Sequence, residues 1–559
     1  MAFSTTQGFC KTVIAGACAT LILAACGGGG GGNDAAQDSI AASSSGATEN
    51  YAVDTAAADQ AGDQDEVLLD TEPAPEEEEV TGNAYAGLAA VSNRFSCGGS
   101  VENEAWAMWN GSTFMRSWIQ GDLDRVTKQG DVYGLYDFQI ESQNLWSMAE
   151  RCNRTDKLQE AARMIRSTYA KLVPAPNGAH GRAWVCKGGP GTVCYDSGLA
   201  NEEVKLVSFQ FLGVASFVAN ALAKSGAALT TEDKNFINET AKVTTEHLVR
   251  WANEYQTERL QTMVSAGVSD VAYDDSFLLF SDIDLWHLTV YAELAGVREW
   301  QAKQGIAVSS GNDALLRTHL GALLSAYKKR TANLKSGTGA QLPSTTMSDL
   351  DRGFWGNMSA NTYASYAGAT KPVNCSSGYA QVSTSSFSKR TDISWDFSHA
   401  RRLVQAMDGL TRNREALQTR FGVTTAQLPS TGQPRAFAAA LVNKVWNGSK
   451  TEPLFKNYWS GANGWFGAVY DSNSGYCDEG MKPYAMTDTF PTGGFITWNR
   501  YYPVIGQLGA KLYDLSKNSA GSSFMTSRYS RLSNASGSEN RAISNFMFLP
   551  TLVGVGIAN

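Results

Sequence analysis

Apolar positions recur with a helical period through most of the chain beyond residue 90. Residues 158–172 show this period and stop before Pro174, and residues 204–223 are nearly continuously apolar, as expected for a buried inner helix. Thr231-Glu232-Asp233 is a capping signal for a helix predicted to continue through the sequence HLVRWANEYQ. Further helices are predicted over residues 284–295, 312–334, 398–410, 435–445 and 502–515. Strand-like runs are few and short, so the pattern predicts a mainly all-α fold of about ten to twelve helices joined by long loops.

The N-terminus has a different pattern. One cation, Lys11, precedes an apolar run over residues 13–25, which is too short to span a bilayer comfortably but suits the core of a signal peptide. The run ends in Leu23-Ala24-Ala25-Cys26, which resembles the lipobox of bacterial lipoproteins. An ordinary cleavable signal with a chance cysteine is the alternative.

The lipobox resemblance implies how the protein is exported. Residues 1–25 would be removed as a signal peptide, and the thiol of Cys26 would receive the lipid anchor. The protein would then contact a membrane through lipid alone. In lipoproteins a glycine after the cysteine, as at Gly27, favours the outer membrane of the bacterial envelope.

Residues 26–88 lack the apolar content of a folded segment. They open with an unbroken glycine run at residues 27–32 and close with Glu76-Glu77-Glu78-Glu79. Low hydrophobicity and high like charge cannot offset the entropy of the chain, so we predict a disordered tether that spans on the order of 45 Å. It would hold off the membrane a helical domain at residues 89–525, on which a C-terminal segment at residues 526–559 packs.

The net charge of −8 is misleading because the acidic residues are unevenly distributed. The first 90 residues hold 14 acidic residues and one lysine, which leaves 45 basic and 40 acidic residues for the rest of the chain. The domain is therefore mildly positive, but no dense Lys/Arg stripe indicates a nucleic-acid partner. The chain has five histidines, too few for a large metal cluster, and it carries no phosphate-loop, dinucleotide-binding or haem-attachment motif. We therefore predict no metal and no cofactor.

Six cysteines follow Cys26, and an even number in an exported chain indicates three disulfides. A zinc site is the competing interpretation, but no pair of cysteines is separated by two residues. The predicted pairs are Cys186–Cys194 across a Gly-Gly-Pro-Gly loop, Cys97–Cys152 and Cys375–Cys477.

Several predicted helices are preceded by a polar stretch that carries aromatic and acidic residues. If alternate helices form an inner ring, the N-termini of these helices converge on one face, which would be a cleft lined by carboxylates, Trp and Tyr. The stretches are residues 133–137, 201–203, 273–275, 392–399 and 487–494.

With this arrangement, residues 95 to 520 resemble the (α/α)-toroid enzymes that act on polysaccharides, including glycoside hydrolases and polysaccharide lyases. The resemblance is architectural, and it implies a substrate class and no assigned catalytic residues, because a fold alone does not determine function. One large toroid or two fused domains both suit a folded part of this length.

Glycoside hydrolysis needs one protonated and one ionised carboxyl group, together with flat apolar platforms for the sugar rings. The carboxyl candidates are Asp275 (or its neighbour Asp274), Asp284 and Asp396. Asp396 lies between Trp395 and Phe397, where loss of water is expected to raise its pKa toward that of a general acid. The alternative for Asp396 is a helix N-cap, and the alternative for Asp274 and Asp275 is a turn or an N-cap. The platform candidates are Trp146, Trp286, Trp395 and Trp498.

Two histidines lie one helical turn after an acid. His287 follows Asp284, and His399 follows Asp396, so each pair can be a catalytic base with its orienting carboxylate. His287 could also form a metal fragment with Asp282. The alternative is a buried histidine whose hydrogen bonds are satisfied.

A polysaccharide lyase needs a base and cations that neutralise a uronate carboxylate. His399 with Arg401 and Arg402 could supply these groups, and Arg500 and Tyr501 are further candidates. The alternative for the two neighbouring arginines is a surface or ion-paired position. A lipoprotein that binds glycan without cleaving it is the third hypothesis, after hydrolysis and elimination.

Overall fold

The computed structural model describes residues 93–110, 114–308, 311–376, 379–470, 477–518, 522–533 and 537–558. The predicted signal peptide, Cys26 and the tether lie outside these residues. Helix accounts for 59% and strand for 6% of the described residues, which confirms the prediction of a mainly helical fold. The described part contains 18 helices, more than the ten to twelve predicted, because several helices are only four to eight residues long.

The helices and strands have the following bounds. The longer helices are α3 (Ser100–Asn110), α4 (Phe114–Asp124), α5 (Tyr133–Arg151), α6 (Thr155–Tyr169), α8 (Lys205–Lys224), α9 (Thr231–Trp251), α10 (Glu254–Ser265), α11 (Asp282–Lys303), α12 (Asp313–Arg330), α14 (Arg402–Arg412), α18 (Pro503–Asn518) and α20 (Ser538–Leu552). The shorter helices are α7 (Val193–Asp196), α13 (Phe397–Ala400), α15 (Arg414–Phe421), α16 (Gln433–Ala440), α17 (Thr489–Thr492) and α19 (Ser523–Arg528). The strands are β1 (Val173–Pro174), β2 (Arg182–Ala183), β3 (Thr331–Lys335), β4 (Thr346–Leu350), β5 (Val373–Asn374), β6 (Tyr379–Ala380), β7 (Val469–Tyr470) and β8 (Cys477–Asp478).

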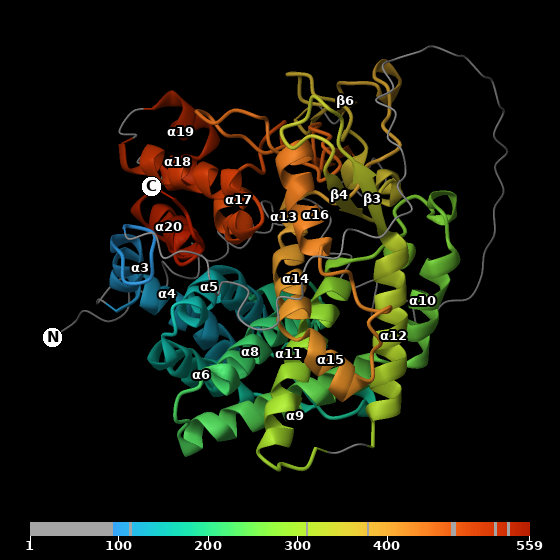
Figure 1. The fold of residues 1–559 in the computed structure, drawn as a ribbon. Coiled ribbons are helices and arrows are strands. Elements are labelled where there is room, and N and C mark those ends of the chain that lie inside the picture. Colours follow the sequence, from blue (N-terminus) through green and yellow to red (C-terminus); the bar gives the residue numbers. More distant parts are fainter. Residues whose placement is uncertain are drawn as a thin grey trace.

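Helices α5, α8, α11 and α14 form the centre of the molecule (Figure 1). Helix α8 packs between α5 and α11, and α14 packs on α11. Helix α8 is long and apolar enough to cross a membrane by length and composition, but 89% of its most apolar window is buried by the surrounding helices. The continuous apolar run at residues 204–223 therefore marks an inner core helix, as predicted.

Two neighbouring outer helices, α9 and α10, begin at well-formed N-caps. The Thr230 side chain and the Asp233 carboxylate satisfy each other's backbone N–H groups in a capping box that begins α9. The predicted continuation of this helix beyond Trp251 is wrong, because the Asn253 side chain accepts a hydrogen bond from Gln256 N and caps a separate helix, α10.

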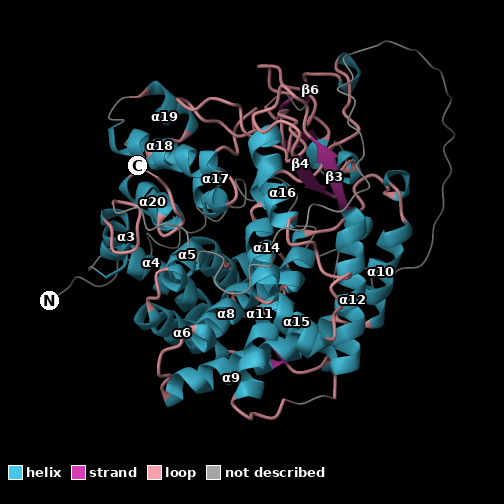
Figure 2. Ribbon diagram, in the orientation of Figure 1, coloured by secondary structure: helices cyan, strands magenta, loops and turns pink. Residues whose placement is uncertain are grey.

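The helix predicted over residues 312–334 is also wrong at its end. Helix α12 stops at Arg330, and Thr331 to Lys335 form strand β3, which pairs antiparallel with β4. Four such two-stranded pairs are the only sheets among the residues that the structure describes. Figure 2 shows that β3, β4 and β6 lie with long loops at one end of the molecule, where β3 continues from the end of α12 and β4 packs against α16.

All three predicted disulfides are confirmed: Cys97–Cys152, Cys186–Cys194 and Cys375–Cys477. The first attaches the segment before α3 to the end of α5, and the third joins the β5–β6 and β7–β8 hairpins. The C-terminal helix α20 packs on both α3 and α5. Segments far apart in the chain are thus fixed around the central helices.

Candidate functional site

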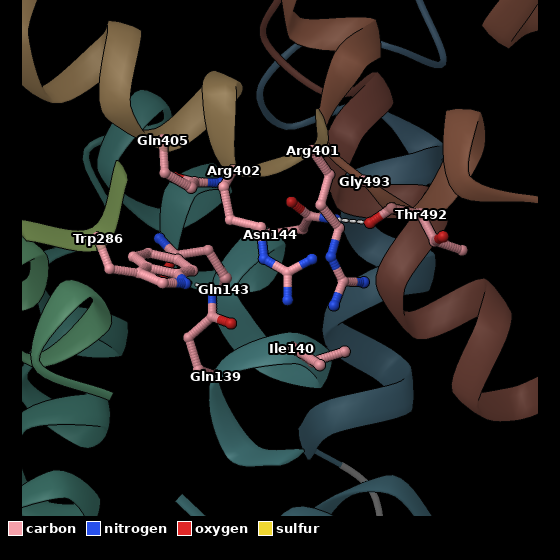
Figure 3. A pocket seen from close by; sticks show the side chains of 10 residues that line it. All are labelled: Gln139, Ile140, Gln143, Asn144, Trp286, Arg401, Arg402, Gln405, Thr492 and Gly493. Carbon is pink, nitrogen blue, oxygen red and sulfur yellow. Dashed lines mark hydrogen bonds between the residues drawn. The ribbon is translucent and has the colours of Figure 1, made fainter. Parts of the chain in front are cut away.

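A small pocket, open to solvent, lies where central helices and the C-terminal region meet (Figure 3), and we call it the cavity. Its walls come from α5, from the first turns of α11 and α14, and from the end of α17. Four of the five polar stretches singled out in the sequence lead to or supply this lining. The lining residues are Gln139, Ile140, Gln143, Asn144, Trp286, Arg401, Arg402, Gln405, Thr492 and Gly493.

Two neighbouring arginines dominate the chemistry of the cavity. The side chains of Arg401 and Arg402 both extend into it, with their guanidinium groups close together (Figure 3). The Nη2 atom of Arg401 is buried and has no hydrogen-bond partner among the described residues. Arg402 is held by longer contacts, at 3.4 Å from the Asp282 carboxylate and 3.4 Å from the Tyr136 hydroxyl. None of the ten lining residues carries a carboxylate, so the cavity is cationic.

Amide side chains form the wall opposite the arginines. Gln139 donates to Gln143 over 3.4 Å, and Gln143 donates to Ser147 over 3.3 Å, so the three side chains follow one face of α5. Asn144 donates to the backbone oxygens of Thr492 (2.7 Å) and Met547 (2.8 Å) and thereby fixes α17 and α20 against α5. The remaining amide atoms can donate to or accept from a polar ligand.

Trp286 closes one side of the cavity. It is 2% exposed, and its indole N–H donates to Gln210 over 3.1 Å. Its ring lies against Gly213 of α8, where an added Cβ atom would come within 2.6 Å of two ring carbons. Glycine at position 213 therefore lets the ring approach the helix backbone, and this contact fixes the orientation of the wall.

Asp396 and His399 form the pair predicted from their spacing. Asp396 caps α13, since its Oδ1 atom accepts from the backbone N–H groups of Ser398 and His399. Its Oδ2 atom lies 2.5 Å from Nδ1 of His399. Burial favours the neutral acid, but the charge and hydrogen bond of His399, with the Ser398 bonds, outweigh it and hold the pKa of Asp396 below its ordinary value. The expected rise of this pKa is therefore wrong.

His399 is near Arg402 in the helix but is not among the residues that line the cavity. Arg401 joins α13 to α14 with helical φ and ψ of −58° and −25°, so the helix runs through from residue 397 to residue 412. On such a helix His399 and Arg402 are one turn apart and neighbours. The His399 side chain is 25% exposed.

Asp284 has a structural environment. Its carboxylate binds the Arg259 guanidinium through two contacts of 2.9 and 3.0 Å and completes a capping box with Ser281. Burial would raise its pKa, but the Arg259 ion pair and the Ser281 N–H bond lower it to about 2. The carboxyl group is thus ionised throughout the neutral range, and among the described residues it has no hydrogen bond to His287.

His287 and Asp275 lie away from the cavity lining. The His287 ring is buried, stacks on Phe209 with 3.9 Å between ring centroids, and donates Nδ1–H to Ile283 O. Burial lowers its pKa well below the ordinary value, so the ring is neutral. Asp275 is exposed and caps a short 3-10 turn by accepting from Phe277 N. Its carboxylate is not brought together with those of Asp284 and Asp396 by any contact.

The other sequence candidates are mostly packed into the core. Trp146 meets Trp109 edge-on, and Trp498 meets Trp459 edge-on, so neither ring has a free face at the surface. Trp395 is 2% exposed and packs on Trp355. Arg500 forms an ion pair with Asp408 and covers the ring of Tyr501. Of the substrate-binding candidates from the sequence, Trp286 and Arg401 line the cavity.

Several lining residues were absent from the sequence candidates. Gln139, Ile140 and Gln405 were not singled out, and Thr492 and Gly493 were named only as part of the stretch at residues 487–494. A signal existed for the first of these, because Gln139, Gln143 and Ser147 place polar side chains at four-residue intervals on a helix that is otherwise buried. Thr492 and Gly493 reach the cavity only through the folding of α17 against α5.

The described residues hold one group with the composition of a metal site, formed by Cys97, Glu102 and Cys152. Both sulfur atoms are joined in a disulfide, and Glu102 accepts hydrogen bonds from Trp106 and Arg154. This group is therefore structural.

Searches found no match for the chain among protein-family models, curated proteins or solved structures.

Proposed function

We propose that the helical domain binds a carboxylate-bearing polysaccharide in the Arg401–Arg402 cavity and cleaves it by uronate elimination. The observation that supports this proposal is the pair of adjacent guanidinium groups in the cavity, whose other polar groups are amides and a hydroxyl. Guanidinium groups bind carboxylates through two parallel hydrogen bonds, and they neutralise the charge that builds up when the neighbouring carbon loses its proton.

His399 supplies the base in this proposal. Asp396 accepts a hydrogen bond from the Nδ1–H group of the ring. The other ring nitrogen, Nε2, then carries no proton and can take one from the carbon next to the uronate carboxylate. The electron pair of that carbon–hydrogen bond forms a double bond as the glycosidic oxygen leaves, and the leaving oxygen takes up a proton from a general acid or water. No water enters the sugar ring, so the product is an unsaturated uronate.

Hydrolysis by the aspartates has less support. It needs a carboxyl group that remains protonated near neutral pH. Asp284 and Asp396 both have lowered pKa values, and both are occupied by ion pairs and helix caps.

The proposal includes the setting of the enzyme. We infer that Cys26 carries a lipid anchor in the bacterial envelope and that the helices form an (α/α) toroid around the cavity. Three disulfides are compatible with an oxidising compartment outside the cytoplasm, and the mainly helical fold is compatible with a toroid.

The test is to incubate the purified full-length protein in detergent with neutral and uronic polysaccharides. New reducing ends and the ultraviolet absorbance of unsaturated sugars are followed together. Elimination produces both signals on a polyuronate. Reducing ends without unsaturation would replace elimination with hydrolysis, and retention of glycan without either signal would make the protein a binder.

A further inference from the structure

A second group of cations lies on the loop-rich side of the protein, away from the cavity lining. Arg352, Arg390, Lys444 and Lys456 form this group, which we call the basic patch. Asp392 bridges the two arginines, at 2.8 Å from Arg390 and 2.9 Å from Arg352. Asp349 lies 3.4 Å from Arg352, and burial raises the pKa of this carboxyl to about 6.

Backbone pairing brings the two lysines together. Lys456 N donates to Val445 O over 2.9 Å, and a bridge pairs Trp446 with Phe455, so Lys456 lies opposite Val445, the residue that follows Lys444. The turn at Ser460 and Gly461 closes the group, because Ser460 O accepts from Arg390 and a Cβ atom at Gly461 would lie 3.1 Å from Lys444 O.

Neither lysine has a direct ion-pair contact among the described residues, although Asp392 and Asp349 lie near enough to Lys444 to oppose the lowering of its pKa. Both side chains are partly buried, and neither ammonium group has a hydrogen-bond or ion-pair contact among the described residues. Burial and the neighbouring cations lower the pKa of each lysine; for Lys456 these cations are Arg390 and Lys444. Two carboxylates thus face four cations, and like charges held together in this way favour a bound anion.

The basic patch is connected to the cavity by a short stretch of backbone. Phe397 N donates to Asn457 O over 2.7 Å, and Trp459 N donates to Trp395 O over 2.8 Å. Segment 456–459 therefore lies beside the residues that lead into His399 and Arg401. Arg390 and Arg401 are separated by eleven residues, so their Cα atoms are at most ~40 Å apart. A linear polymer can reach both groups.

We propose that the basic patch is a second subsite that holds carboxylates of the same acidic polysaccharide at a distance from the cavity. This inference rests on the proposed function. The subsite contacts long polymers, whereas short oligosaccharides bind at the cavity alone. It therefore extends the surface over which the enzyme contacts its substrate.

The test compares polygalacturonate and alginate with their trimers as ligands for full-length wild-type protein and Lys444→Gln/Lys456→Gln. The exposed pair Lys234→Gln/Lys242→Gln on α9 is the matched control. We expect the patch variant to bind the polymers on the order of tenfold more weakly. The slope of log affinity against log salt concentration should be shallower, by an amount that corresponds to roughly one to two fewer released counterions. Trimer binding and the melting temperature should not fall, and the control should match the wild type.

The outcomes separate the two proposals. Equal polymer affinity and salt dependence in wild type and patch variant would overturn the second subsite while the cavity proposal stands. Equal weakening by the α9 control would show a general charge effect and also overturn the subsite. Failure of the wild type to bind polymers and trimers alike would overturn the proposed function itself.

Discussion

The Nδ1 atom of His399 lies 2.5 Å from the Oδ2 atom of Asp396, while the Oδ1 atom of the same carboxylate caps the helix on which His399 stands. One side chain thus orients both the ring and the backbone that carries it. Asp284 and His287 have the same spacing in the sequence but are partnered separately, with Arg259 and with Ile283 O. Spacing alone therefore does not determine whether an acid and a histidine form a pair.

Replacement of Asp396 should separate the two tasks of its carboxylate. An asparagine oxygen can still cap α13, but its NH₂ group cannot accept from Nδ1 of His399. We expect Asp396→Asn to lower kcat for elimination on the order of 10²-fold with KM nearly unchanged, because Asp396 positions the base without touching substrate. Asp396→Ala should lose about 1 kcal/mol more stability, since it also removes the cap.

Steady-state kinetics and urea unfolding of both variants measure these effects. An Asp396→Asn enzyme with wild-type kcat would remove His399 from the mechanism. Equal stability of the Asn and Ala variants would mean that the cap contributes nothing measurable.

The Asp284–Arg259 ion pair predicts a defined pH dependence of stability. The folded pKa of Asp284 is about 2, below its ordinary value of 3.8. Because the folded pKa is lowered, the stabilisation is present above about pH 4 and is lost as the pH falls toward 2. The difference corresponds to about 2 kcal/mol.

Asp284→Asn should be destabilised by about 3–5 kcal/mol at pH 7, because it leaves Arg259 buried without a counter-charge. The gap between the unfolding free energies of wild type and variant should narrow as the pH drops from about 4 to 2. A gap that stays constant over this range would contradict the assigned ion pair. The Asp284→Asn/Arg259→Gln double variant tests the coupling directly.

Loop length predicts unequal contributions from two disulfides. Cys186–Cys194 closes a separation of 8 residues, and Cys375–Cys477 closes one of 102. If restriction of the unfolded chain dominates, removal should cost about 2.5 kcal/mol for the short loop and about 4.7 kcal/mol for the long one. Paired Cys→Ser variants and chemical denaturation measure both values, and a larger loss for Cys186–Cys194 would refute the loop-length argument.

Local sequence signals were sufficient for the helices and the disulfides. The apolar run at residues 204–223 forms α8, and each end of the helix differs from the prediction by one residue. A surface this apolar is stable only when it is buried in the core. The errors occurred where a local signal competed with the helical period. Asn253 caps a new helix, and the β-branched Thr331 begins a strand that pairs with residues ending at Leu350.

The candidate site was only partly predictable, because tertiary contacts set its chemistry. Trp395 and Phe397 were expected to raise the pKa of Asp396, but the turn that follows directs N–H groups and His399 at the carboxylate. The aromatic residues Trp146 and Trp498 were expected as sugar platforms and are core residues. Tryptophan occurs both in cores and at sugar-binding surfaces, and the sequence does not distinguish a buried indole from one that lines a cavity.

The contact between Gly213 and Trp286 makes one cavity wall sensitive to a single methyl group. A Cβ atom at Gly213 would overlap the indole ring, so Gly213→Ala should lose about 1–3 kcal/mol through overpacking. Gly321 is also within a helix, but its nearest neighbour would lie 3.8 Å away, so Gly321→Ala should gain up to about 1 kcal/mol. Thermal unfolding of both variants distinguishes the positions, and a neutral Gly213→Ala would mean that the ring moves freely.

Arg401 and Arg402 should respond differently to the same substitution, although they are adjacent and face the same cavity. Arg402 is 2% exposed and contacts Asp282, Ser398 O and Tyr136, so Arg402→Gln removes structural contacts together with charge. We expect this variant to lose about 2–4 kcal/mol of stability, because the Asp282 carboxylate is left beside a neutral group.

Arg401 has a buried guanidinium nitrogen with no hydrogen-bond partner among the described residues, so its positive charge is available to a ligand. Arg401→Gln should therefore leave stability within about 0.5 kcal/mol of wild type or raise it, because repulsion from Arg402 is relieved. It should nevertheless lower kcat/KM on acidic polysaccharides by roughly 10²- to 10³-fold, as expected when one charge-stabilising group is lost. The exposed Arg317→Gln on α12 is the control for loss of one cation. If Arg401→Gln cleaves and binds like the control, the cavity is not the carboxylate site, whatever the stability of the Arg402 variant.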